Sequence, residues 1–86
     1  MKKEFDQLLA TLATERDEIS LQMHLASMEV KEEFSHADEK WEQIKEKAGE
    51  IADDSVETTD EFIAAAKIAG EELMEAYQRI TKRIKD

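Results

Sequence analysis

The residue spacing most suggestive of metal chemistry is a glutamate followed three residues later by a histidine, Glu33 and His36. In di-iron helical bundles, this Glu-x-x-His spacing supplies two ligands from one helix. Two chains would supply two copies, with further carboxylates from Glu71, Glu72 or Glu75. On a regular helix, however, His36 projects about 120° away from the apolar stripe described below, so both ligands cannot point into a bundle interior. We therefore expect a solvated helix face here and assign no metal ligands, and we keep a di-iron-like metal site as the alternative function.

A second candidate constellation is Asp17, Ser20 and His24, which share one helix face and resemble the residue types of a hydrolase triad. A regular helix offers these side chains neither the strained turn of a nucleophile elbow nor oxyanion donors. The two glycines, Gly49 and Gly70, are isolated and form no phosphate-binding loop. We expect a protein without enzymatic activity, catalytic residues or cofactor.

Charge and composition exclude several classes of partner. The 86 residues include 22 acidic and 12 basic side chains, giving a net charge of -10. Nucleic acids and anionic membranes both require cationic neutralisation, so neither is expected as a partner. No apolar run approaches the roughly 20 residues of a membrane span, and the first residues lack the pattern of a signal peptide. With no cysteine, disulfides and thiolate zinc sites are impossible. The sequence predicts a soluble, cytoplasmic protein forming one domain over residues 1–86.

The first half of the chain has the periodicity of a long helix. Apolar residues recur at alternating steps of three and four, interrupted only by Arg16. They are Phe5, Leu9, Leu12, Ile19, Met23, Ala26, Val30, Phe34, Ala37, Trp41, Ile44, Ala48 and Ile51. The pattern predicts one helix over about residues 3–52, without any internal proline. Two consecutive steps of four, from Ala26 to Val30 and from Val30 to Phe34, form a stutter that locally relaxes a left-handed supercoil.

The second half predicts another helix after a turn. The stretch IADDSVETTDEF contains two overlapping capping boxes, Asp54-x-x-Glu57 and Thr58-x-x-Glu61. These boxes predict a turn at about residues 53–57 and a helix over about 58–85, with Gly70 permitting a close helix approach. Its apolar face contains Phe62, Ala66, Ala69, Leu73, Ala76, Tyr77, Ile80 and Ile84. The fold class is therefore all-α, a long coiled-coil-like helical hairpin. One uninterrupted rod is the competing interpretation, because no residue of the turn forbids a helix.

The hairpin leaves apolar surface uncovered. A second helix of about 28 residues covers only the later half of the first, and an exposed apolar stripe of that size is expected to find a partner. Leu21, Leu25 and Met28 lie on the opposite face, which indicates that the helix is sandwiched between neighbours. We expect an antiparallel homodimer that crosses near residues 26–28, in which each early half packs on the other chain's hairpin. A tetramer or a parallel dimer is also compatible with the stripe.

Charged residues predict the register of this assembly. Arg16, at a core position, is expected to face Glu39 of the second chain, with Asp38 and Glu42 near, and to select the register. Within the hairpin, Arg83 is expected beside Glu29. The residues expected at the interface between chains are Leu12, Arg16, Ile19, Leu21, Met23, Leu25, Ala26, Met28 and Val30.

The segment LATERDEISLQMHLASMEVKEEFSHADEKWEQIKEK, with a second helix ending in EELMEAYQRITKRI, resembles small bacterial coiled-coil proteins of unknown function. The likeness is carried by Arg16-Asp17-Glu18, Leu25-Ala26, Glu29-Val30-Lys31, Trp41-Glu42 and Tyr77. It implies a helical bundle and no enzymatic residues. We therefore expect a non-enzymatic, self-associating interaction or scaffold module with an unidentified protein partner.

Overall fold

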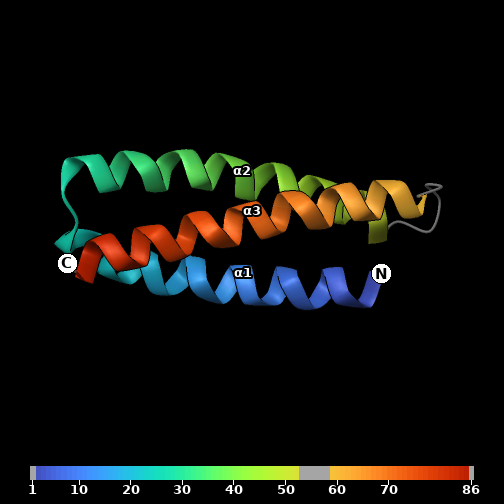
Figure 1. Ribbon diagram of the computed structural model, residues 1–86, viewed down its shortest axis with the longest axis horizontal. Helices are drawn as coiled ribbons and strands as arrows, with labels where there is room; N and C mark the ends of the chain where they lie inside the picture. Colours follow the sequence, from blue (N-terminus) through green and yellow to red (C-terminus); the bar gives the residue numbers. More distant parts are fainter. Residues whose placement is uncertain (1, 53–58, 86) are drawn as a thin grey trace.

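The computed structural model describes residues 2–52 and 59–85, which form three helices and no strand. Helix α1 spans Lys2–Gln22, α2 spans Met28–Ala52 and α3 spans Asp60–Lys85, and a short 3-10 helix, η1, spans Met23–Leu25. Figure 1 shows α1 antiparallel to α2 and parallel to α3, and α3 packs against both of the other helices. The result is a rod-shaped three-helix bundle of 43 × 17 × 17 Å.

In the single chain, the expected long helix over residues 3–52 is wrong, because the chain turns back after α1. Ala26 is extended (φ −86°, ψ 150°), and α2 begins two residues later. The Ser27 hydroxyl accepts a hydrogen bond from the Val30 N–H at 3.3 Å, and the Ser27 carbonyl accepts one from the Lys31 N–H at 3.0 Å. Ser27 therefore caps the N-terminus of α2, satisfying backbone donors that a continuous helix would have paired internally.

The turn lets the chain cover its own apolar stripe. Phe5, Leu12 and Ile19 of α1 are all buried. Burying each such side chain contributes about 1.5–3 kcal/mol, whereas each helical hydrogen bond lost at the turn costs about 1 kcal/mol. Folding back is therefore favourable within a single chain. The uninterrupted rod is also wrong, since α3 lies antiparallel beside α2 (Figure 1).

The predicted inner faces of the helices are confirmed even though the long helix is broken. Every residue of the predicted apolar stripes is buried or half-buried, and Arg16 is half-buried among them. The buried hydrophobic core consists of Phe5, Leu12, Ile19, Val30, Ala37, Trp41, Ile44, Ile51, Ile63, Ala66, Leu73, Tyr77 and Ile80. Ile63 was not expected on the inner face of α3. A single core therefore runs along the bundle between the three helices.

Helix α3 begins slightly later than expected. The Thr59 hydroxyl accepts a hydrogen bond from the Phe62 N–H at 3.1 Å, so Thr59 caps the helix that starts at Asp60. The predicted turn at 53–57 and the capping residues Asp54, Glu57 and Thr58 lie outside the described residues. Acidic residues in the first turn of α3 and basic residues in its last turn complement the helix dipole, as the sequence indicates.

Gly70 lies at a close approach between α3 and α1. A Cβ atom at this position would be 2.7 Å from Leu8 Cδ2 and 3.5 Å from Leu12 Cδ1, and the glycine itself is buried. The expected role of Gly70 in close helix approach is confirmed. Gly49 is different, because a Cβ atom there would meet nothing within 4 Å.

The same substitution at the two glycines is expected to act in opposite directions. Gly70→Leu overpacks the α1–α3 contact and is expected to lower the free energy of unfolding by about 1–3 kcal/mol. Gly49→Leu improves helix propensity at an open position and is expected to raise it by about 0.5–1 kcal/mol. Chemical denaturation of both variants measures these changes. Equal effects at the two sites would contradict the close approach at Gly70.

Candidate functional site

The nine residues expected at the interface between chains differ in exposure: six are covered at least in part within the single chain, and three are exposed. Leu12, Ile19 and Val30 are fully buried by other helices of the same chain, and Arg16, Met23 and Ala26 are half-buried. The remaining three residues, Leu21, Leu25 and Met28, have exposed fractions of 76%, 67% and 72%. Contacts within one chain therefore cover these six residues, which were expected at the interface between chains. Of the nine residues, only Leu21, Leu25 and Met28 expose large apolar side chains.

We call Leu21, Leu25 and Met28 the turn patch, because they lie in and around the turn that joins α1 to α2. Leu21 belongs to the last turn of α1, Leu25 to η1, and Met28 is the first residue of α2. The inner face at this end is formed by other residues, including Ile19 and Val30, so the patch residues project outward. Within the described residues, the only other large exposed hydrophobic side chain is Ile68, on α3. The turn patch therefore concentrates exposed apolar side chains at one end of the bundle.

The last turn of α3 lies at the same end as the turn patch (Figure 1) and is basic. Arg83 of this turn is hydrogen-bonded to Glu33 and, through Nη2, to Glu29 Oε2 at 3.2 Å. The expected proximity of Arg83 to Glu29 is confirmed. These bonds join α3 to the first two turns of α2, although exposed pairs of this kind contribute little to stability.

A polar cluster with one residue from each helix includes an ion pair whose two side chains are 31% and 33% exposed. Arg16 of α1 binds the Asp38 carboxylate of α2 through two hydrogen bonds, one from Nε to Oδ1 and one from Nη2 to Oδ2 at 3.1 Å. The hydrogen bond to Asp38 raises the pKa of the Arg16 guanidinium. The sequence suggested Glu39 of another chain as the partner of Arg16. The structure corrects this expectation to Asp38 of the same chain, because α1 folds back along its own α2.

Tyr77 of α3 completes the cluster. Its side chain is fully buried, and its hydroxyl has no hydrogen-bond partner among the described residues. Burial raises the pKa of Tyr77, the negative charge of Asp38 raises it further, and Arg16 opposes both effects. A neutral tyrosine beside a neutralised ion pair offers no activated nucleophile or base. The Arg16–Asp38 pair instead fixes the position of α1 along α2, because any sliding of α1 would separate the two side chains.

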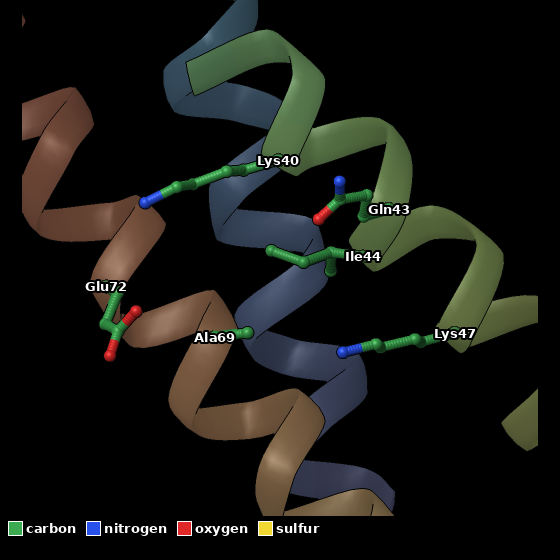
Figure 2. Close-up of a pocket in the computed structure, with 6 residues that line it drawn as sticks. All are labelled: Lys40, Gln43, Ile44, Lys47, Ala69 and Glu72. Carbon is green, nitrogen blue, oxygen red and sulfur yellow. The ribbon is translucent and has the colours of Figure 1, made fainter. Parts of the chain in front are cut away.

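A small hollow lies between α2 and α3. Its volume is about 160 Å³, and it is lined by Lys40, Gln43, Ile44, Lys47, Ala69 and Glu72. Figure 2 shows Lys40 extending from α2 toward α3, with Ile44 and Ala69 between the two helices. Sites for small molecules usually enclose about 300–1,000 Å³, so this hollow is a surface groove rather than a substrate site.

The candidate metal and catalytic residues do not converge. Glu33 is hydrogen-bonded to Arg83, and His36 is exposed on α2. Asp17, Ser20 and His24 are exposed, and the His24 ring Nδ1 lies 3.0 Å from the Leu21 carbonyl oxygen. In the part of the chain that the structure describes, no group of three or more His, Asp or Glu side chains is placed to hold a metal ion. No arrangement for metal binding or acyl transfer is therefore visible among these residues.

No family model, curated protein or solved structure matches the chain. Among residues 2–52 and 59–85, no helix combines the length and apolar character needed to cross a bilayer. Conclusions about function therefore depend on the geometry described above.

Removing the Asp38 carboxylate is expected to destabilise the bundle. Asp38→Ala leaves the half-buried Arg16 guanidinium without its acceptor, so the free energy of unfolding is expected to fall by about 1 kcal/mol. Glu39→Ala, one residue further along α2 and exposed, serves as the control and is expected to change it by less than about 0.5 kcal/mol. Thermal and urea denaturation measure both values. A larger loss in the Glu39 variant would contradict the assigned pair.

The buried Tyr77 hydroxyl predicts a loss of stability in alkali. Because its pKa in the folded chain is above the ordinary value of 10.0, ionisation favours the unfolded chain. Stability is expected to be unaffected by Tyr77 below pH 10 and to fall above it, by up to about 1.4 kcal/mol per pH unit. Tyr77→Phe is expected to remove this part of the pH dependence, measured by urea denaturation across the alkaline range. As the chain has one tyrosine, ultraviolet absorbance follows its ionisation directly; an ordinary titration midpoint in the folded protein would refute the prediction.

Proposed function

We propose that the chain is a non-enzymatic protein–protein interaction module that self-associates, and that the turn patch is its contact surface. One observation carries the proposal: three large apolar side chains are two-thirds or more exposed at one end of a bundle that buries its other apolar stripes. Exposed apolar clusters on soluble domains mark interaction sites. The net charge of -10 disfavours nucleic acids and anionic membranes as partners, and we propose a scaffold role in the cytoplasm.

A second copy of the chain is the partner that we propose for the turn patch. A surface that docks on itself around a two-fold axis places the same apolar side chains on both sides of the contact. Electrostatics favour this end of the bundle for such a contact. Each copy has a net charge of -10, and the basic last turn of α3 reduces the repulsion between two copies at the end where the turn patch lies.

The dimer that we propose is antiparallel: a two-fold axis across the rods brings the two turn patches together while the bundles meet end to end or overlap in opposite directions. Leu12, Ile19 and Val30 support the contact indirectly, since they hold α1 and α2 in place beneath the patch. A tetramer would require a second contact surface, for which exposed Ile68 on α3 is the one further large apolar side chain among the described residues.

A charged substitution in the patch is expected to separate the copies without unfolding them. Leu25→Asp places a carboxylate at a position that is 67% exposed in the single chain, so the melting temperature of the monomer is expected to change little. In the dimer, the same carboxylate would be buried without a partner, so the solution mass is expected to fall from dimer to monomer. Light scattering at micromolar concentration measures the mass.

Leu12→Asp is the matched control, because Leu12 is buried within the chain. This variant is expected to lose its cooperative melting transition altogether, owing to the buried charge. Ile68→Asp, at an exposed position away from the turn, is expected to remain dimeric. A wild-type chain that is monomeric at every accessible concentration would refute the proposed function.

A further inference from the structure

The turn between α1 and α2 contains none of the residues that normally end a helix. No proline or glycine occurs between Gln22 and Met28, and all residues from Met23 to Leu25 are compatible with an α-helix. The turn consists of η1, the extended Ala26 and the cap at Ser27. Its conformation therefore depends on the packing of α1 against the rest of the bundle, and only weakly on local preference.

The inner faces of α1 and α2 stay in phase across this turn. Ile19, Met23, Ala26 and Val30 follow steps of four, three and four, as they would on one straight helix, and all four are buried or half-buried. In the folded-back chain, α1 and α2 each pack against α3 separately, so their inner faces need not follow one continuous helical spacing. A continuous helix does need it, since only then does a single stripe face a neighbour along the whole length.

The surfaces of α2 and α3 that contact α1 are the same in every copy of the chain, so α1 of either copy can occupy them. α1 packs on α3 through its buried face and the close approach of Leu8 to Gly70, and it binds α2 through Arg16 and Asp38. If the turn straightened, α1 would leave its own bundle, and the α1 helix of a second copy could make the same contacts there. The exchanged dimer would keep these contacts and regain helical hydrogen bonds at residues 23–27.

We infer that the chain exchanges α1 with a second copy, using residues 23–27 as the hinge, and that the closed monomer and the exchanged dimer are two arrangements of the same set of contacts. The inference rests on the proposed self-association and adds a second way in which two copies engage. On a straight helix, the turn patch faces away from the inner stripe, so the exchange leaves the patch free. Association through the patch and exchange of α1 are therefore separable by experiment.

Two substitutions at Ser27 test the hinge. Both Ser27→Ala and Ser27→Pro remove the hydroxyl that caps α2, so the loss of the cap is common to the two variants. Alanine favours a continuous helix, whereas proline is compatible with the extended Ala26 that precedes it and disrupts a continuous helix. After refolding from denaturant at high protein concentration, the exchanged dimer is expected to be about 10⁴-fold less favourable in the proline variant than in the alanine variant, because each of its two straightened hinges loses about 100-fold. Circular dichroism checks that both variants are folded.

A pair of cysteines reports which chain supplies α1. The natural chain has no cysteine, and a Cβ atom at residue 70 would lie 3.4 Å from Leu8 Cγ, so Leu8→Cys with Gly70→Cys places two thiols within reach of a disulfide. In the closed monomer, oxidation links residues of one chain, whereas in the exchanged dimer it links two chains. Non-reducing denaturing electrophoresis separates the two products. The pair is combined with each Ser27 variant and, as a further background, with Leu25→Asp.

The inference predicts disulfide-linked dimers in the Ser27→Ala background, their loss in the Ser27→Pro background, and their persistence with Leu25→Asp. Only internal disulfides at all concentrations would overturn the exchange. If those internally linked chains still formed dimers in solution, the proposed contact through the turn patch would stand without the exchange. Equal amounts of linked dimers in the alanine and proline backgrounds would also overturn the inference, because collisions between chains would then account for them.

Discussion

The covering of one long apolar stripe is the constraint on which the structure depends. The stripe runs from Phe5 to Ile51, and a helix of α3's length can cover only about half of it when it is straight. Breaking the stripe at residues 23–27 halves its length and brings both halves against the same helix. α3 is therefore the shared partner in the bundle, and the free energy gained from burying α1 offsets the helical hydrogen bonds lost at the turn.

The inner faces were predictable because burial depends on periodicity, and periodicity is a local property of the sequence. The spacing of three and four identified the buried residues of α2 and most of those of α3 without any knowledge of the turn. It also placed Arg16 among apolar residues on the inner face. The identity of its partner was one residue away from the expected position, because Glu39 and Asp38 adjoin on α2 and the antiparallel register depends on the geometry of the turn.

The turn itself was harder to predict, since residues 23–27 contain no proline or glycine and tertiary packing decides between turn and helix. Two signals in the sequence mark its position. Ser27 is a favourable N-cap residue, and the stutter at Ala26, Val30 and Phe34 begins within the break. Neither signal is decisive, because the choice between turn and straight helix depends on contacts between residues distant in sequence, such as Leu8 with Gly70. The same limit applies to the turn patch: its residues were expected to be sandwiched, and folding back leaves them exposed in the single chain.

The acidic first turn and basic last turn of α3 lie at opposite ends of a molecule 43 Å long. At physiological ionic strength, electrostatic interactions are screened over about 8 Å, so the two ends are electrostatically isolated from each other. An approaching molecule responds to the local field of the end that it meets, and the total charge of the chain describes that field poorly. Association rates at the two ends are thus expected to respond differently to added salt, so the bundle is electrostatically polar along its length.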